Sequence, residues 1–358
     1  MESSPTTQVA YHEASEKESE SHDVLLAPDK PRKKFFWWHM TKKQRILVIL
    51  GLVLLLLLLL FLILWFAVIP AVIRHYVRSV KLSVNYMDVV RIPDNNTITV
   101  DLSLNIQHDI GIAATTDNTT VSMLYGGAEF ATLPFPGLRL KTGFQNYNLT
   151  IDADMPITDL EAFNAMADAL MKESEITLTS IASLDINGLG MSFHDLKLKR
   201  DLPVEGFVGF SDPEPVIENI ELATCSSSEY LININVTLNN TAQMGLDGIG
   251  VLNVSVYNGQ EYLGYALSQK PELGIPRGMS NQSYRITMDA DNVSISSLIL
   301  SALAGSVQFY IVGNNPYVTT HGQFKEALTN VNMSVPASAG ALATMKVGPS
   351  CNLSSLLS

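Results

Sequence analysis

An uninterrupted apolar run constrains this chain more than any other feature. Residues Ile46–Ile73 carry no charged side chain, and Leu52–Leu64 consists only of Leu, Val, Ile and Phe. About 20 such residues suffice to cross a bilayer core as a helix. The run therefore predicts one transmembrane helix over residues 46–73. At ~1.5 Å per residue it would reach about 42 Å, so we expect the helix to tilt or its last turns, around Pro70, to leave the hydrocarbon.

Flanking residues predict the direction of this helix. The 45 mostly polar residues before it argue against a cleaved signal peptide. Close to the two ends of the run, basic side chains are more numerous before it than after it, seven in residues 30–45 against three in residues 74–89, and such residues collect on the cytosolic side. We therefore expect a cytosolic N-terminus and a type II orientation, with an aromatic belt at residues 35–38. The basic residues are Lys30, Arg32, Lys33, Lys34, Lys42, Lys43 and Arg45 before the run, and Arg74, Arg78 and Lys81 after it.

Ten Asn-x-Ser/Thr acceptors for N-glycosylation all follow the apolar run, which independently favours a luminal or extracellular C-terminal part. Chance alone predicts only about four or five in a chain of this composition. The acceptors are Asn95, Asn118, Asn148, Asn235, Asn239, Asn253, Asn281, Asn292, Asn332 and Asn352.

The two cysteines, Cys225 and Cys351, lie in the same C-terminal part. Disulfides persist in luminal and extracellular compartments, so one bridge between them is an expected arrangement. Two buried thiols are the alternative, and a metal site would need more ligands than these two residues supply.

Charge and composition differ on the two sides of the helix. Residues 1–45 are rich in Ser and Glu with few large apolar residues, which predicts a disordered cytosolic tail. Residues 74–358 contain 15 Lys/Arg and 28 Asp/Glu, a net charge of −13. Such an acidic part repels phosphate backbones and anionic headgroups, so we expect no nucleic-acid partner.

Three ordered matches indicate an internal duplication. The first is Val100–Asn105 with Ile234–Asn239, the second Tyr125–Phe130 with Tyr257–Tyr262, and the third Leu149–Asp154 with Ile286–Asp291. Their offsets of 134, 132 and 137 residues drift little. We therefore predict two homologous modules, at residues 78–207 and 214–351.

The matched segments alternate apolar and polar residues with a period of two, which predicts β-strands. Gly126-Gly127 and Asn258-Gly259 are preferred dipeptides for two-residue hairpins. Apolar residues at helical spacing predict one helix over Asp159–Glu173, capped by Thr158 or Asp159, and a second over Ile295–Leu303. The expected fold is mainly β: two tandem antiparallel sandwiches behind one N-terminal transmembrane helix.

These motifs carry a family resemblance. An alternating strand ending in Asn, a Tyr-x-Gly-x-Glu-aromatic hairpin and the run Leu133–Leu138 resemble the LEA-2 (water-stress and hypersensitive-response) domain. The arrangement of basic tail, anchor and tandem copies is similar to the fungal DUF3712 vacuolar-membrane proteins. The resemblance implies seven-stranded, fibronectin III-like sandwiches that bind lipid between sheet and helix. It also favours a vacuolar or endomembrane location over the plasma membrane, and it carries no catalytic residues.

Groups that could support catalysis are few. Asp152/Asp154 and Asp289/Asp291 are carboxylate pairs on one strand face, although Asp at a strand end more often turns or caps the chain. His75, His108, His194 and His321 lack metal-ligand spacing and are expected at surface or turn positions. There is no nucleophile elbow, phosphate loop, dinucleotide fingerprint or zinc motif, so we expect neither enzymatic activity nor a cofactor.

The sequence leaves three functional hypotheses. The first is a non-enzymatic membrane protein whose modules bind lipid or another hydrophobic ligand, with Leu160, Phe163 and Leu170 as lipid-facing candidates. The second is a scaffold at the vacuolar or plasma membrane that links a luminal protein partner to the cytosolic tail. The third, a hydrolase, has only the Asp-Ala-Asp strands to support it.

Overall fold

The computed structural model describes residues 41–290, 296, 298, 300, 308–336 and 339–352. The predicted tail up to residue 40, Asn292 and most of the predicted helix Ile295–Leu303 lie outside these residues. The chain divides into two compact units, one ending at Leu64 and the other beginning at Trp65.

The first described element is the apolar helix. Helix α1 (Lys42–Ile63) begins at a capping box in which the Thr41 side chain and Gln44 satisfy each other's backbone N–H groups. A π-helical turn, η2 (Leu64–Val68), leads into α2 (Ile69–Ser79), with Pro70 in its first turn. Among the described residues, this stretch is the one helix long and apolar enough to cross a membrane. It confirms the prediction of one N-terminal helix that can span a bilayer. Its last turns belong to the second unit, where Ile73 and Val77 are buried.

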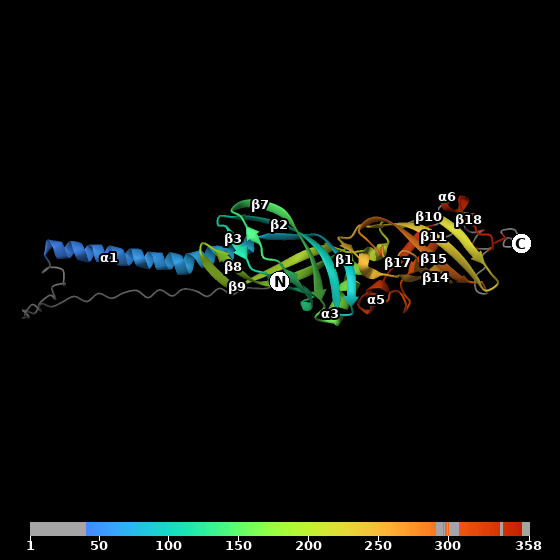
Figure 1. Ribbon diagram of the computed structural model, residues 1–358, viewed down its shortest axis with the longest axis horizontal. Coiled ribbons are helices and arrows are strands. Elements are labelled where there is room, and N and C mark those ends of the chain that lie inside the picture. Colours follow the sequence, from blue (N-terminus) through green and yellow to red (C-terminus); the bar gives the residue numbers. More distant parts are fainter. Residues whose placement is uncertain are drawn as a thin grey trace, which may run out of the picture. The chain divides into compact units, whose positions relative to one another are not determined.

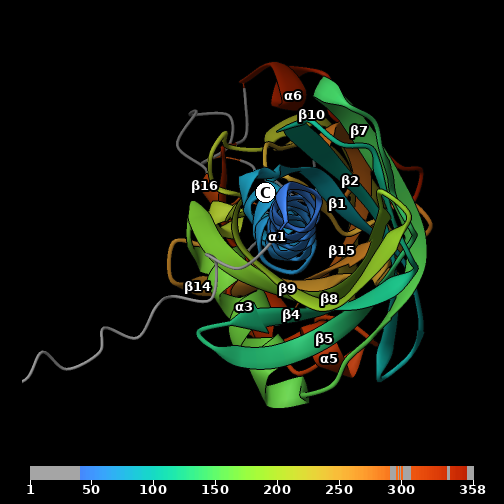
Figure 2. The same ribbon diagram turned by 90° about the vertical axis from the view of Figure 1, so that its left-hand side faces the viewer.

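The first region of the second unit spans residues 81–205 and contains two sheets (Figures 1 and 2). One sheet has the order β12-β1-β2-β7. The other has the order β5-β4-β8-β3-β6, and β9 pairs with β8. The strands are β1 (Lys81–Asp94), β2 (Thr97–Ile110), β3 (Ala114–Thr116), β4 (Thr119–Tyr125), β5 (Ala128–Phe135), β6 (Arg139–Leu140), β7 (Gly143–Pro156), β8 (Glu175–Gly188), β9 (Met191–Glu205) and β12 (Met244–Gly245).

The second region, residues 216–347, is built on one sheet with the order β17-β16-β13-β14-β15-β11-β10-β18. Short helical turns η3 (Val208–Phe210) and η4 (Asp247–Ile249) lie before and within it. Its other elements are β10 (Val216–Cys225), β11 (Glu229–Asn240), β13 (Asn253–Asn258), β14 (Glu261–Ser268), β15 (Gly278–Asp289), β16 (Gln308–Val312), α5 (Gly322–Leu328), β17 (Asn332–Pro336), α6 (Ala339–Ala343) and β18 (Lys346–Val347).

The protein is mainly β, as the alternating pattern predicts. In β2 the apolar members of the alternating segment Val100–Asn105 are all at most 5% exposed, namely Val100, Leu102 and Leu104. The first predicted hairpin turn is confirmed, because Tyr125 pairs with Ala128 across Gly126-Gly127. The second lies one residue later than predicted: Asn258 is the last strand residue and pairs with Glu261, so Gly259 and Gln260 form the turn.

The predicted helix after β7 is present as α3 (Leu160–Lys172), and Asp159 caps it by accepting hydrogen bonds from two backbone N–H groups. Its apolar face is buried at the junction with the second region. Phe163 packs edge-on against Phe324 of α5, with ring centroids 5.4 Å apart, and Asn330 donates to the Asp168 carboxylate. The two regions therefore share a continuous apolar core.

A segment of the second region also completes the first region's sheet. Strand β12 pairs in parallel with β1, and the Met87 N–H donates to the Gln243 carbonyl at 2.8 Å. Arg277 donates to both Asp88 oxygens, at 2.6 and 2.9 Å. Gly248 lies so close to β1 that a Cβ atom added to this glycine would be 2.6 Å from the backbone nitrogen of Arg91. This junction therefore joins the two regions by backbone and side-chain contacts.

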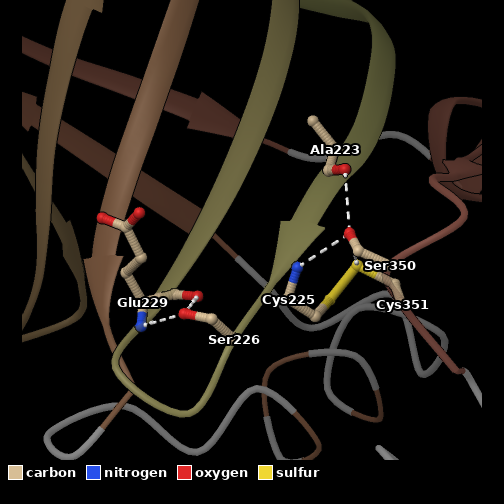
Figure 3. Close-up of a disulfide and its surroundings, with 6 residues drawn as sticks. All are labelled: Ala223, Cys225, Ser226, Glu229, Ser350 and Cys351. Atoms are coloured by element: carbon tan, nitrogen blue, oxygen red, sulfur yellow. Dashed lines mark hydrogen bonds between the residues drawn. A yellow bond between two sulfur atoms is a disulfide. The ribbon is translucent and has the colours of Figure 1, made fainter.

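A disulfide ties the end of the second region to its first strand (Figure 3). Cys225, at the end of β10, is bonded to Cys351, and the two Cα atoms are 5.0 Å apart. The neighbouring Ser350 hydroxyl accepts from the Cys225 N–H and donates to the Ala223 carbonyl. The bond closes a loop spanning 126 positions.

Candidate functional site

An apolar cavity of about 110 Å³ lies inside the first region. Residues of both sheets line it, and a smaller space of about 20 Å³ lies farther along, near α3. One water needs about 10–15 Å³ by the same measure, so the larger cavity has room for several non-hydrogen atoms of a ligand. An empty space of this size forgoes packing contacts and lowers stability, which makes it a candidate ligand site.

The cavity wall presents hydrocarbon almost everywhere. Of its 29 lining residues, only Tyr76, Thr116, Thr119 and Ser180 carry a polar side-chain atom. The threonine and serine hydroxyls are already engaged: Thr116 accepts from the Leu138 N–H, Thr119 donates to the Ser183 carbonyl, and Ser180 donates to the Arg200 carbonyl. Since burying an unpaired polar group is costly, this wall favours an aliphatic occupant over a polar one.

Helix α2 forms part of the cavity wall. Ile73, Tyr76 and Val77 all line the cavity, so the residues that follow the apolar run also close one side of the site. The Arg200 guanidinium on β9 donates to the carbonyls of Val77, Arg78 and Val80 at 2.9 to 3.1 Å. These are the orphan carbonyls of a helix C-terminus, where a cation is also favoured by the helix dipole. Burial lowers the pKa of Arg200.

The predicted lipid-facing residues on α3 do not line the large cavity. Phe163 and Leu170 are 1% and 3% exposed and border only the smaller space, whereas Leu160 points outward and is 45% exposed. The sequence identified an apolar helix face, which the structure uses mainly for packing against Phe130 and Phe324. The larger cavity lies instead between the sheets, where alternating strand residues supply its wall.

The predicted carboxylate pairs lie apart from the cavity. Asp152 and Asp154 are exposed on the outer face of β7, where Asp154 accepts from the Thr99 hydroxyl at 2.6 Å. Asp289 is exposed at the end of β15, and Asp291 lies outside the described residues. Within the described part of the chain, no group of three or more His, Cys, Asp or Glu side chains is placed to hold a metal ion.

One histidine prediction is wrong. His75 and His194 are exposed, but His108 on β2 is only 2% exposed and neither ring nitrogen has a hydrogen-bond partner among the described residues. Burial lowers the pKa of His108, while nearby Asp109 opposes that shift. Its position in an inward-facing series after Leu104 and Ile106 was the available sequence signal, since alternate strand residues share a face.

Nine of the ten glycosylation acceptors are described. Asn239 and Asn253 are half-buried, and the other seven are exposed: Asn95, Asn118, Asn148, Asn235, Asn281, Asn332 and Asn352. On the outer sheet faces, Asn148 accepts from Asn105 and Asn281 accepts from the Thr237 hydroxyl. Glycans attached there would point away from the cores.

These features define a mainly β protein with one candidate membrane helix and an apolar cavity. A family model described as "Protein of unknown function (DUF3712)" matches residues 128–256. The match supports the DUF3712 family, and it extends from β5 of the first region to β13 of the second. A search of curated proteins found no match.

Solved structures give only distant similarities. A bacterial adhesin from Mobiluncus mulieris is 9% identical, with a TM-score of 0.17 over 65% of this chain and 80% of that one. The Salmonella enterica SafA pilin in complex with the SafB chaperone is 11% identical, with a TM-score of 0.15 over 57% and 95%. CBD12 from CALX1.2 is 10% identical, with a TM-score of 0.18 over 75% and 96%. Scores this low carry no argument about fold or function.

Proposed function

We propose that this chain is a non-enzymatic type II membrane protein whose first β region binds the hydrocarbon part of a lipid. The single observation that supports this proposal is the apolar cavity bounded by both sheets and α2. The proposal includes a sandwich arrangement in each region, a tandem LEA-2-like origin and a vacuolar or other endomembrane location with the glycosylated part in the lumen.

The cavity wall favours an acyl chain over a ligand with internal polar groups. Most of its lining side chains are Leu, Val, Ile, Met, Ala or Phe, and three of its four hydroxyl-bearing residues are already hydrogen-bonded. A lipid would place hydrocarbon against this wall and keep its headgroup outside. Since α2 belongs to the wall and continues the apolar helix, the membrane itself is the proposed source of the lipid.

The test is mass spectrometry of lipid retained by the purified full chain. Ala182, which is 6% exposed and lines the cavity, can be replaced by Phe to occupy the space. We expect Ala182→Phe to lose at least half of the tightly retained lipid while the protein stays folded. The matched variant Leu160→Ala alters the exposed helix residue and should retain the wild-type amount. Equal retention by wild type and Ala182→Phe would contradict a ligand in this cavity.

An exposed aromatic patch supports the scaffold as a second candidate. Tyr262 and Tyr265 on β14 are 51% and 41% exposed, and Tyr262 packs edge-on against Tyr257 with ring centroids 5.4 Å apart. Tyrosine is enriched in protein interfaces. A scaffold predicts that Tyr262→Ser and deletion of residues 1–34 each abolish the link between the luminal partner and the cytosolic side, while lipid retention persists. An intact link in both variants would contradict a scaffold.

A further inference from the structure

The strand ends around α2 form one end of the first region, where some side chains line the cavity and others face outward. We call this surface the proximal collar and define it as residues 69–81, 106–118, 138–147 and 183–201. Strand pairing brings these segments together: Lys81 pairs with Gln107, Ile110 with Gly143, and Ala114 with Gly188. Helix α2 touches the same end, because a Cβ on Gly111 would lie 2.9 Å from the Tyr76 hydroxyl.

Chain connectivity alone keeps the collar near a membrane. The N-terminus of α2 follows α1 after only the five residues of η2. At ~1.5 Å per helical residue, this connection spans only about 8 Å. Whatever bilayer α1 crosses must therefore lie close to the strand ends that pack on α2.

The collar has the opposite charge to the rest of the C-terminal part. Of the 15 Lys/Arg and 28 Asp/Glu in residues 74–358, it contains eight and five, leaving seven and 23 elsewhere. The collar is therefore net positive, although the net negative charge of residues 74–358 as a whole predicts repulsion from anionic headgroups. Cationic side chains near a bilayer are attracted to anionic lipid. The basic residues are Arg74, Arg78, Lys81, Arg139, Lys141, Lys197, Lys199 and Arg200.

Two large apolar side chains protrude from this basic surface. Phe144, beside Asp109 at the start of β7, is 61% exposed, and Leu189 in the β8–β9 turn is 52% exposed. Leu189 has φ of 55°, a left-handed conformation that Asn or Gly adopts more readily. The turn therefore carries an exposed apolar side chain at a strained position, which is a reason to seek a function for it.

We propose that the proximal collar docks on the surface of the membrane that α1 crosses. Phe144 and Leu189 enter the interface, and the surrounding Lys and Arg side chains contact lipid phosphates, except Arg200, whose guanidinium is engaged with the α2 carbonyls. Apolar side chains beside basic ones are the combination that binds a bilayer surface. Two glycosylation acceptors lie near this surface. Asn148 is four residues from Phe144, or about 13 Å along β7. Asn118, at the edge of the collar, is four residues from Ala114, which pairs with Gly188 beside Leu189. Glycans at both acceptors would therefore start behind the exposed Phe144 and Leu189 side chains. This proposal rests on the membrane helix and not on lipid in the cavity.

The test uses the full chain in lipid nanodiscs, with a photo-reactive benzophenone side chain at position 144 or 189. Positions 279 and 317 in the second region are matched controls, because Met279 and Tyr317 are 79% and 75% exposed. We expect at least fivefold more lipid adducts at positions 144 and 189 than at the controls. Equal adduct yields at all four positions would overturn the proposal.

A second measurement separates docking from folding. Leu189→Asn relieves the strained turn, so the midpoint of thermal unfolding should stay constant or rise while the adduct yield at position 144 falls at least twofold. An unchanged yield at 144 would overturn a docking role for Leu189. Ala182→Phe should lose cavity lipid yet keep these adducts, which distinguishes this proposal from the proposed function.

The charge component is tested by lipid composition. Replacing part of the phosphatidylcholine with phosphatidylglycerol should raise the adduct yield at position 189, and Arg139→Gln combined with Lys141→Gln should reduce that increase. A yield that is independent of phosphatidylglycerol content would overturn the contribution of the basic side chains.

Discussion

The two β regions pair their strands in the same order but differ in how their sheets are joined. Reading across the pairs gives β9-β8-β4-β5, then β7-β2-β1, in the first region and β17-β16-β13-β14-β15-β11-β10 in the second. Between β5 and the end of β7 there is a single isolated bridge, from Ala131 to Ile157, the residue that follows β7. Between β14 and β15 there are five residue pairs. The large cavity lies in the first region, where fewer residue pairs join the two sheets. We infer that the reduced pairing of β5 with β7, which corresponds to β14–β15 in the second region, lets the two sheets stand apart.

Removing the disulfide of the second region is expected to produce the largest difference in stability between the two regions. Replacing Cys225 and Cys351 together by Ser should destabilise the second region by about 4–5 kcal/mol, the chain-entropy value for a loop spanning 126 positions. Thermal unfolding measured with and without a reductant checks this value. Ser350→Ala, which keeps the bond, should change stability by no more than about 1 kcal/mol. An equally large loss in both variants would mean that local hydrogen bonds, not the bond itself, stabilise this end.

A matched pair of leucines sharpens the comparison of packing. Leu104 and Leu238 occupy equivalent places in the repeated segments and are 5% and 4% exposed, but only Leu104 lines the large cavity. Leu238→Ala should cost about 3–4 kcal/mol, and Leu104→Ala about 2 kcal/mol, because a side chain beside existing space loses fewer contacts. Chemical denaturation of the two variants measures the difference. Equal costs would indicate that the cavity is occupied or collapsed in solution.

The α2 cap tests how firmly the cavity wall is held. Arg200→Met removes the donors to the carbonyls of Val77, Arg78 and Val80, and should cost about 2 kcal/mol. Backbone amide exchange should accelerate in α2 and stay unchanged in the second region. Arg285→Met on β15, where the guanidinium contacts one Asn233 side chain, serves as the exposed control. Unchanged exchange in α2 would contradict a role for this cap.

The smallest expected effect is a pH dependence at the junction. Burial and nearby Asp88 raise the pKa of Asp247, and its Oδ2 atom has no hydrogen-bond partner among the described residues. A raised folded-state pKa means that the folded protein binds this proton more tightly than the unfolded chain does. The resulting stabilisation is complete at low pH and is lost as pH rises through the folded-state pKa.

Asp247→Asn should therefore raise stability at pH 7 by up to about 1 kcal/mol, and the gain should shrink as the pH falls toward the unfolded Asp value of about 4. Thermal unfolding at a series of pH values measures this trend. Asp94→Asn, at an exposed turn, is the control. A loss of stability at every pH would show that the Asp247 carboxylate stabilises the junction.

Local sequence patterns predicted the elements but not how they close on one another. Composition was sufficient for the apolar helix, and an Asp before helically spaced apolar residues was sufficient for α3. Alternation in β2 identified Leu102 and Leu104 as inward-facing, yet periodicity does not reveal whether the opposite layer fills the space beside them. The cavity was therefore not predictable, and the sequence indicates lipid-facing candidates on α3 instead, at Leu160, Phe163 and Leu170.

Long-range contacts were the other features that sequence reasoning missed. Arg200 binds α2 carbonyls about 120 positions earlier in the chain, and no local spacing indicates such a pair. The parallel pairing of β12 with β1 involves only two residue pairs. The second hairpin turn lies one residue later than predicted. Asn258-Gly259 and Gly259-Gln260 both offer a glycine for positive φ, and the strand register places the turn at Gly259-Gln260.

The pairing of β12 with β1 also limits how the protein can be dissected. Cutting the chain in the link around residues 206–214 would leave Met87 and Asp88 on the edge of β1 without their β12 partners and would remove Arg277 from Asp88. An uncovered strand edge is a template for pairing with another chain. The first region alone should therefore self-associate, so its minimal independent unit extends past its own last strand to include residues 243–249.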